Sequence, residues 1–361
     1  MVTVAEKLCY SAYVFMRLTQ SDIARIAKVS QATVSRVVAG DTRVESTVAE
    51  EVRKVMREYD YRPDERARSL RGKGSGMIGL VVRRPSNGLS EDPFFATLVS
   101  HILDYLVGTP YHLCLDVVPT LQSQQAIYDE MLRTRRVDGL ILVESETRDR
   151  RIHKLHADRF PFVLIGNFVG ADDEEVVDVP SVDNDNVLAA QMATRHLLDN
   201  GYQRVGILGG PPGITVSEDR ITGYQQAIGC RQGEALVWHS EFGYEAARFA
   251  ARSILTSREK PDALVVLDDF MAMGVMRAAR DLGFSIPNEL GVVGFNDSVL
   301  CNLISGGLTS VSLNISKVVG SACSMLIKIL EGQALPNPNR VTIPCELSAR
   351  GSSVREVPVV G

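Results

Sequence analysis

From Met77 onward, short runs rich in valine, isoleucine and leucine alternate with longer stretches of helical periodicity. The apolar runs are MIGLVV (77–82), HLCLDVV (112–118), DGLILV (138–143), PFVLI (161–165), RVGILG (204–209), DALVVLD (262–268) and LGVVGF (290–295). The helical candidates lie near 94–107, 122–135, 187–200, 218–230, 244–256, 270–282 and 316–331. This alternation predicts parallel sheets covered by helices on both faces. Weaker strands bring the total to about ten, too many for one tidy open sheet, so we expect two lobes divided near Asp178.

The stretch from Thr19 to Gly40, TQSDIARIAKVSQATVSRVVAG, has a different pattern. Thr19 followed three residues later by Asp22 predicts a capped helix start, and Ser30 is expected to cap a second short helix. The apolar stripes of the two helices are Ile23, Ile26, Ala27, Val34, Val37 and Val38. Two short helices joined by a three-residue turn predict a helix-turn-helix, whose second helix enters the DNA major groove.

The first turn of that second helix is the part that meets base edges. Here it carries Gln31, Ala32 and Thr33, with Ser35 and Arg36 one turn further on. The competing interpretation is an ordinary three-helix bundle, which has the same periodicity. The face left free by the valines argues against it, because Gln, Thr, Ser and Arg suit bases and phosphates, whereas Glu and Lys are typical of a helix that is merely solvated.

A third helix follows, with Ser46 as its expected cap, and then comes YRPDERARSLRGKGSG (61–76). Pro63 can start a helix as its first residue, and Ala67 and Leu70 would share one face of a turn and a half. So short a helix is not stable alone in water. We therefore expect this segment to fold only against a partner.

IARIAKVSQATVSRVVAG followed by YRPDERARSLR resembles the DNA-binding head and hinge of the lactose-repressor and galactose-repressor (LacI/GalR) family. The resemblance extends over 18–351 and implies a body like a type I periplasmic sugar-binding protein, with the chain crossing three times between two lobes. In that family, paired hinge helices fold on DNA and insert a leucine into the minor groove. By position this leucine is Leu70, with Ala67 as the hinge contact, and Thr19 and Ser30 belong to the DNA-binding set.

Three residues depart from the family pattern. Lys28 stands where the family has the turn glycine, so a non-glycine residue is expected to hold a left-handed conformation, at about 1 to 2 kcal/mol. Ala39 replaces the asparagine before Gly40. Asp64 replaces the hinge asparagine and adds a negative charge near phosphates.

The expected fold is a small all-α helix-turn-helix head joined to an α/β body of two doubly wound parallel-sheet lobes. The expected segments are 1–16 (an extension that is disordered or a mis-start), 17–60 (DNA-binding head), 61–75 (hinge helix and linker), 76–351 (effector-binding and dimerisation body) and 352–361 (tail). Within the body we assign about 76–178 and 313–337 to the first lobe, and about 179–312 and 338–351 to the second.

Charge is distributed unevenly along the chain. Residues 17–75 contain 13 Lys and Arg against 9 Asp and Glu, a net +4, whereas residues from 76 onward contain 25 against 34, a net −9. A basic head on an acidic body suits DNA binding at one end only. The 6 cysteines form no CxxC pair and are typical of reduced core residues. We expect a cytoplasmic, nucleoid-associated protein without a membrane segment.

A ligand of doubly wound sheets sits at the carboxyl ends of the strands. The residues that match the family's effector positions are Phe94 and Phe95 in DPFF, Arg220 in EDRITGY, Trp238, Asp268 and Asn296. An aromatic face with polar groups around its rim is the usual chemistry of a sugar site. The alternatives are that one of the two phenylalanines only packs, that Arg220 pairs with Glu218 or Asp219, and that Trp238 lies at the rim. Asp269 is expected to cap the next helix, and Asp297 to orient a loop.

Enzyme motifs are weak by comparison. GGPPG (209–213) follows a strand but lacks the GxGxxG spacing and the GK[ST] ending of phosphate loops. His153 and His156 have helical spacing but no third ligand nearby, so exposed loop histidines are expected rather than a metal site. No serine has a GxSxG setting. We expect no catalysis, no metal and no cofactor.

The sequence therefore predicts a DNA-binding transcriptional regulator, a repressor, that binds a double-stranded operator as a homodimer. Gln31 and Ala32 are expected to discriminate bases, while Thr33, Ser35 and Arg36 fix position. A small-molecule effector, a sugar or sugar derivative, is expected to control it allosterically. The alternative function is a periplasmic-type sugar receptor without a DNA role, which has no use for QATVSR or ARSL. The end of the chain has no heptads, which favours a dimer over a tetramer.

Overall fold

The computed structural model describes residues 18–38, 41–61, 74–84, 92–168, 179–230 and 234–355. The chain forms two compact units, residues 1–75 and 76–361. Some expectations fall outside the described residues: those for 1–16, Ala39, Asp64, Ala67 and Leu70. No described helix combines the length and apolarity that crossing a lipid bilayer requires.

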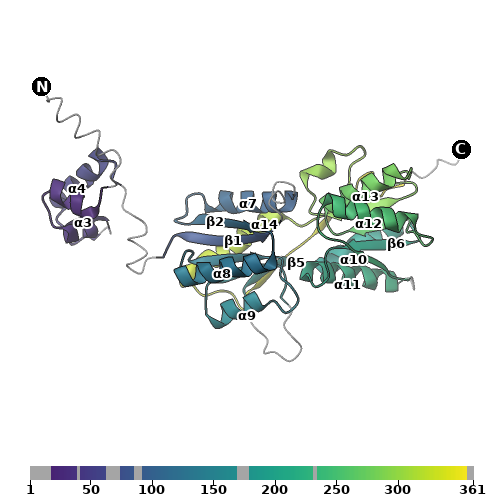
Figure 1. The fold of residues 1–361 in the computed structure, drawn as a ribbon, viewed down its shortest axis with the longest axis horizontal. Helices are drawn as coiled ribbons and strands as arrows, with labels where there is room; N and C mark the ends of the chain where they lie inside the picture. Colours follow the sequence, from purple (N-terminus) through teal and green to yellow (C-terminus); the bar gives the residue numbers. More distant parts are fainter. Residues whose placement is uncertain are drawn as a thin grey trace, which may run out of the picture. The chain divides into compact units, whose positions relative to one another are not determined.

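The described helices of the head are α2 (Gln20–Ile26), α3 (Gln31–Val38) and α4 (Ser46–Glu58) (Figure 1). Their apolar faces meet in one core, in which Ile23, Val34 and Val52 are fully buried. Tyr61 is buried in the same core, so the head extends one residue beyond the expected boundary at residue 60.

The turn between α2 and α3 closes with two backbone hydrogen bonds. The Val29 N–H donates to the Ala24 carbonyl at 2.9 Å, and the Lys28 N–H donates to the Arg25 carbonyl at 3.4 Å. This Schellman arrangement places one residue in the left-handed region. Lys28 occupies it with φ 54°, which confirms the expectation drawn from the missing turn glycine.

Two of the three expected caps of the head are confirmed. Thr19 and Asp22 form a capping box, in which the Asp22 carboxylate accepts from the Thr19 N–H at 2.9 Å. The Ser30 hydroxyl accepts from a backbone N–H of α3 at 3.1 Å. Ser46 is not a cap, because α4 begins at Ser46 itself and Glu45 holds the cap position without a side-chain bond.

The first lobe of the body contains a parallel six-stranded sheet in the order β11-β5-β4-β3-β1-β2. Its strands are β1 (Met77–Arg83), β2 (His112–Val118), β3 (Gly139–Val143), β4 (Phe162–Ile165), β5 (Ser181–Asn184) and β11 (Arg340–Ile343). Its helices are α7 (Pro93–Leu106), α8 (Leu121–Thr134), α9 (Arg150–Ala157) and α14 (Ile315–Leu330). Helices α7 and α14 bury one face of the sheet, and α8 and α9 bury the other.

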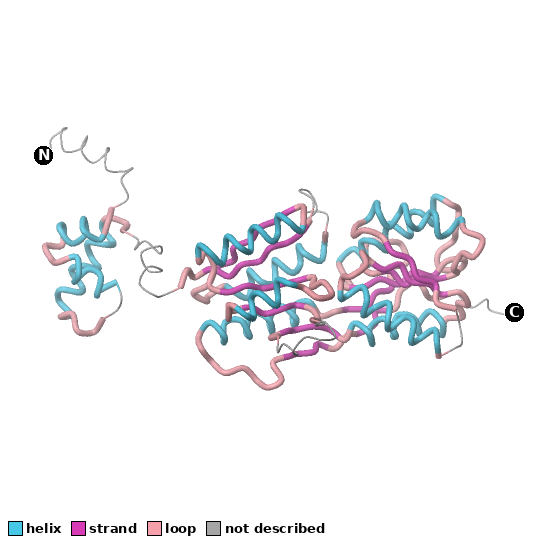
Figure 2. Tube along the Cα trace, turned by 60° about the horizontal axis from the view of Figure 1, so that its bottom comes forward, coloured by secondary structure: helices cyan, strands magenta, loops and turns pink. Residues whose placement is uncertain are grey.

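The second lobe repeats this plan with the sheet order β12-β10-β9-β8-β6-β7, in which only β12 is antiparallel to its neighbour. Its strands are β6 (Val205–Gly209), β7 (Leu236–His239), β8 (Ala263–Val266), β9 (Gly291–Phe295), β10 (Thr309–Ser312) and β12 (Glu346–Ser348). Its helices are α10 (Asn186–Asp199), α11 (Thr215–Gly229), α12 (Tyr244–Thr256), α13 (Asp269–Asp281) and the short 3₁₀ helix η1 (Val299–Asn302). Figure 2 shows helices on both faces of each sheet, as predicted.

The chain passes between the lobes three times, after β5, after β10 and after β11, which confirms the expected number of crossings. Asn184 ties the three crossings together. Its side-chain amide donates to the Leu313 carbonyl at 3.0 Å and to the Ile343 carbonyl at 2.9 Å. We call these three residues the Asn184 cluster.

The expected lobe boundaries near Asp178 and residue 338 are wrong. Strand β5 pairs with β4, and β11 pairs with β5, so both belong to the first sheet rather than to the second lobe. Their sequences, SVDN and RVTI, are short and partly polar. They therefore lack the continuous apolar run that marks the other strands.

The expected tail at 352–361 begins too early. Ser352 and Ser353 are buried, and the Val292 N–H donates to the Ser352 carbonyl at 2.9 Å. The Ser352 hydroxyl accepts from the Thr309 N–H at 2.8 Å. These residues are part of the second lobe.

Candidate functional sites

The exposed surface of α3 carries the predicted reading residues. Gln31, Ala32 and Arg36 are exposed, whereas Thr33 and Ser35 are half-buried. Burial of Val34 and Val37 on the opposite side of the helix fixes this orientation. The side chains expected to discriminate bases therefore remain available to a partner.

Hydrogen bonds with neighbouring residues hold several of these side chains. The Gln31 amide donates to Gln20 Oε1 at 3.1 Å, which links the first residues of α2 and α3. The Ser30 and Thr33 hydroxyls lie 2.9 Å apart. The Thr19 hydroxyl is engaged with Asp22 at 2.7 Å, and this bonding lowers the pKa of the Asp22 carboxyl. Gln20 was missed by the sequence reasoning, because only the fold brings it beside Gln31.

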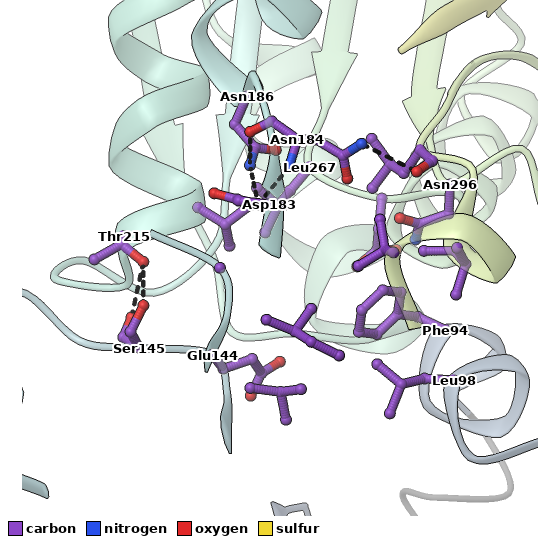
Figure 3. A pocket seen from close by; sticks show the side chains of 18 of the residues that line it. Phe94, Leu98, Glu144, Ser145, Asp183, Asn184, Asn186, Thr215, Leu267 and Asn296 are labelled. Carbon is purple, nitrogen blue, oxygen red and sulfur yellow. Dashed lines mark hydrogen bonds between the residues drawn. The ribbon is translucent and has the colours of Figure 1, made fainter. Parts of the chain in front are cut away.

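A second candidate site is a cavity of about 110 Å³ in the body, at the carboxyl ends of strands from both sheets. Figure 3 shows Phe94 and Leu98 of α7 facing it together with Asp183, Asn186 and Asn296. One water needs about 10 to 15 Å³ by this measure. The cavity therefore has room for one small polar molecule.

Arg220 reaches this cavity from α11 and is 4% exposed. Its Nε and Nη2 donate to Asn186 Oδ1 at 3.1 and 3.0 Å, and Nη1 donates to the Leu267 carbonyl. The guanidinium also lies 4.1 Å from the centre of the Phe295 ring. Burial lowers its pKa to about 10. The alternative pairing with Glu218 or Asp219 on the surface is therefore wrong.

Two half-buried carboxyls, those of Asp183 and Asp268, line the same cavity. Burial raises the pKa of Asp183 and that of Asp268 to about 7. Asp268 also caps α13, because its Oδ1 accepts from the Met271 N–H at 2.7 Å. This cap was expected from Asp269, which instead accepts from the Ser298 N–H at 2.8 Å and the Ser310 hydroxyl at 2.6 Å.

Asn296 lines the cavity after β9 with φ 101°, a left-handed backbone that asparagine tolerates better than most residues. Its neighbour Asp297 accepts from the Ser348 hydroxyl at 2.8 Å and pairs with Arg350 at 2.7 Å. Asp297 therefore orients its loop, as expected.

Arg84, at the end of β1, is a cavity residue that the sequence did not reveal. It donates to Asp92 Oδ2 at 3.0 Å and to both oxygens of Glu144. Its guanidinium lies 4.4 Å from the Phe95 ring centre and 4.9 Å from that of Phe242. Burial alone would lower the pKa of Arg84, but Glu144 and Asp92 raise it above its usual value.

Comparison with known proteins identifies the family of both parts of the chain. Residues 19–64 match the family described as bacterial regulatory proteins, lacI family, and residues 194–353 match the periplasmic binding protein-like domain. The ribose operon repressor of Halalkalibacterium halodurans is 32% identical over 332 residues, which cover 92% of this chain and 96% of the relative. The chain belongs to the LacI family.

Solved structures share the whole architecture of this LacI-family chain. A transcriptional regulator CelR–cellobiose complex superposes with a TM-score of 0.70 and 25% identity, covering 93% of this chain and all of that one. The lac repressor dimer bound to operator and an anti-inducer gives a TM-score of 0.81 at 22% identity over 94% of this chain, a likeness of fold. The chain is thus a DNA-binding transcriptional regulator with a helix-turn-helix head and a two-lobed ligand-binding body.

The two phenylalanines of the DPFF motif of this LacI-family member have different roles. Phe94 is half-buried and lines the cavity, whereas Phe95 is fully buried and packs in the core of the first lobe. The alternative that one of the two only packs is therefore confirmed. Phe95 is not a cavity residue.

Trp238 does not line the cavity, contrary to the expectation from its match to the family's stacking aromatic. It lies within β7, the edge strand, and its ring covers Gly206, where an added Cβ would come within 2.5 Å. Phe242, after β7, lines the cavity instead.

The two weak enzyme motifs have structural explanations. In GGPPG, the Gly213 N–H donates to Glu218 Oε1 at 2.9 Å, so a side chain of the protein already uses this donor of the loop. His153 and His156 lie on helix α9 rather than in a loop, and the His153 ring packs edge-on against Phe168 at 5.1 Å. No group of potential metal ligands occurs within the described ranges.

Proposed function

We propose that this LacI-family regulator represses transcription as a homodimer on a pseudo-palindromic operator and responds to a sugar or sugar derivative bound between its lobes. The observation that carries the proposal is the composition of the cavity. Arg220, Asp268 and Asn296 supply donors and acceptors, while Phe94 and Phe242 supply aromatic faces. Such a combination suits the hydroxyls and the C–H faces of a sugar ring.

The relatives support this ligand class. One is named a ribose operon repressor, and a structural neighbour is a regulator solved with cellobiose. Members of the family are transcription regulators rather than enzymes. The site of action that fits such a regulator is the nucleoid, in the cytoplasm.

For the DNA contact, α3 is the proposed reading helix. Gln31 and Ala32 would meet base edges, and Arg36, Thr33 and Ser35 would fix the position of the helix on the DNA. Thr19 and Ser30 would lie beside the phosphates, and the hinge residues Ala67 and Leu70 would enter the minor groove. Each good bidentate base contact is worth about 1 to 3 kcal/mol of discrimination.

Exposed apolar side chains on α7 support a homodimer. Leu103, Tyr105 and Val107 are 50%, 37% and 80% exposed at the end of this helix. Large apolar side chains exposed to this extent are available for contact with another protein surface. A second copy would bring two heads to the two halves of the operator.

The proposed mechanism is allosteric. The sugar would change the angle between the lobes, and that movement would change the distance between the two hinge segments of the dimer. A coupling of about 1 to 3 kcal/mol between effector and operator corresponds to a change in operator affinity of roughly 5- to 150-fold.

Phe94→Ala tests the sugar site. The operator is first selected from random duplex DNA, and sugars are then screened for one that changes operator affinity. The Phe94→Ala variant should need about tenfold more of that sugar, because an aromatic contact is lost, with unchanged affinity for the operator itself.

Phe249→Ala is the matched control, since Phe249 is 80% exposed and outside the cavity lining. Trp238→Ala should leave the sugar response of the full chain intact. A normal response in Phe94→Ala, or a lost response in Trp238→Ala, would contradict the assignment of this cavity.

A further inference from the structure

The cavity contains more acidic than basic groups. Its charged lining residues are Arg84, Asp92, Glu144, Asp183, Arg220 and Asp268. These are four carboxyl groups and two guanidinium groups. The sign and the accessibility of these charges determine which ligands the cavity can bind.

Arg84 has little capacity left for a ligand. Its Nε–H donates to Asp92, its Nη1 donates to the Arg83 carbonyl and to Glu144, and its Nη2 donates to Glu144. Four of its five N–H groups are therefore used. With two carboxylates against one guanidinium, this cluster is itself net negative.

Arg220 is the other cation of the lining, and its hydrogen bonds go to neutral oxygen atoms. Three of its five N–H groups donate to the Asn186 side chain and to the Leu267 carbonyl. One pair of parallel donors, Nε and Nη2, is committed to one oxygen of Asn186. The two N–H groups that remain, one on Nη1 and one on Nη2, are all that Arg220 can offer to a carboxylate or phosphate.

Asp183 and Asp268 complete the wall near Arg220 (Figure 3 labels Asp183). Within the described chain, one oxygen of each carboxyl accepts hydrogen bonds: Asp183 Oδ1 from Asn184 and Asn186, and Asp268 Oδ1 from Met271. The other oxygen of each can accept from a ligand hydroxyl or ammonium group. An anion placed here would instead meet two carboxyls in a poorly solvated space.

We infer that the cavity binds neutral or cationic polyhydroxy ligands and rejects those that carry a carboxylate or a phosphate. This inference rests on the proposed sugar-binding function and narrows its ligand class. The hydroxyls of a neutral ring can donate to Asp183 and Asp268 and can accept from Arg220. Each of these three side chains then has a hydrogen-bond partner in the ligand. An anion can accept from the two spare N–H groups of Arg220 and from the Asn296 amide, but it is repelled by the carboxyls.

The test is a thermal-shift and calorimetric screen of the full chain at pH 8.5, above the pKa of about 7 of Asp183 and Asp268. The screen uses charge-matched sets: neutral sugars, their amino derivatives, their uronic acids and their phosphates. The most strongly binding ring should be a neutral or amino form. Its anionic derivative should bind about tenfold more weakly or worse. An anionic derivative that binds more tightly than its neutral parent would overturn the inference.

Asp268→Asn identifies the cause of this selectivity. Asparagine keeps the cap of α13, because it is as good a cap as aspartate, but it removes one negative charge. The anionic derivative should gain about tenfold relative to the neutral parent. Glu346→Gln, which removes an exposed carboxylate in β12, should change neither affinity.

The outcomes separate the two proposals. If no compound binds, the effector site itself fails, and the charge selectivity fails with it. If a neutral sugar binds but Asp268→Asn leaves the preference unchanged, the sugar site stands and the electrostatic explanation is wrong.

Discussion

At the scale of single residues, two features of the head can be tested: the backbone strain at Lys28 and the hydrogen bond between Gln20 and Gln31. Lys28 holds a left-handed conformation where a glycine would fit without cost, and its position closes the turn between the two DNA-binding helices. Lysine thus retains a conformational penalty that a glycine would not have.

Lys28→Gly should stabilise the head by about 1 kcal/mol, because the left-handed strain is relieved. Hydrogen exchange of the Val34 and Val52 amides in the full chain measures the opening of the head core, and exchange should slow about fivefold. Lys28→Ala is the control, since alanine keeps both the strain and a Cβ. An equal effect of both substitutions would mean that the lysine side chain, not the backbone, was responsible.

Gln20→Met should relax base selectivity. The Gln20 side chain holds one N–H of Gln31 at 3.1 Å and leaves the other N–H and Oε1 for an adenine edge. Methionine has a similar length but no acceptor. Selection of operators from random DNA should show weaker adenine preference at the base pair whose preference Gln31→Ala abolishes.

Gln20→Glu provides the second arm of this test, because it keeps the acceptor. It should retain the adenine preference while lowering affinity for all sequences, since it adds a negative charge near phosphates. Unchanged selectivity in Gln20→Met would show that Gln31 is oriented without Gln20.

At the scale of helices and strands, the order of elements was predictable and several exact assignments were not. Continuous apolar runs in the sequence predicted most of the parallel strands, because a strand that is buried on both faces is apolar along its length. β5 and β11 were assigned to the wrong lobe, since only the pairing of β5 with β4 and of β11 with β5 reveals their sheet. Hydrogen-bonded pairing between distant segments leaves no local pattern.

The candidate site shows the same division. Arg220, Asp268 and Asn296 could be assigned from short motifs after strands. Arg84 and Phe242 could not, because their contact comes from opposite lobes. Trp238 was assigned from its match to the family's stacking aromatic, but it packs on Gly206 instead.

The Asn184 cluster joins three segments of the body, and its contribution to stability can be tested. Asn184→Ala should lower the free energy of unfolding of the body by about 1 to 3 kcal/mol, because two carbonyls of the interlobe crossings lose their donor. Urea unfolding of the full chain measures the loss. Asn302→Ala, at an exposed asparagine of η1, should change the same quantity little. Similar losses in both variants would mean that the hydrogen bonds of the Asn184 cluster do not stabilise the body.

At the scale of the whole molecule, a contact between the lobes complements the three crossings. Ser145 and Thr215 are both buried, and their hydroxyls lie 2.7 Å apart. Beside them, the Thr147 N–H donates to the Gly213 carbonyl at 2.8 Å, and Glu146 forms an antiparallel bridge with Ile214. The lobes are therefore joined at the crossings and again at this bridge, with the cavity lined from both.

Stability of the body should fall as pH rises. Burial raises the pKa of Asp183 and Asp268 to about 7, above the value of about 4 in an unfolded chain. Between these two values the folded state therefore binds more protons than the unfolded state. The stability that the two carboxyls contribute is fully present below pH 4 and is lost as the pH rises through 7. The loss is on the order of a few kcal/mol, because one pKa unit corresponds to about 1.4 kcal/mol.

The melting temperature of the full chain between pH 5 and pH 8 checks this prediction. The double variant Asp183→Asn, Asp268→Asn should flatten the profile, since neither amide titrates. A wild-type melting temperature that rises across this range would contradict the assigned burial of the two carboxyls.

The last described turn has a consequence for genetics. The Ser352 carbonyl and hydroxyl accept hydrogen bonds from the Val292 and Thr309 N–H groups, so these two backbone donors stay paired only in a chain that extends through Ser352. A stop codon at position 352 would unfold the second lobe rather than merely shorten the protein. Its phenotype would be constitutive expression of the target genes through loss of the protein, and it would be mistaken for a defect in operator recognition.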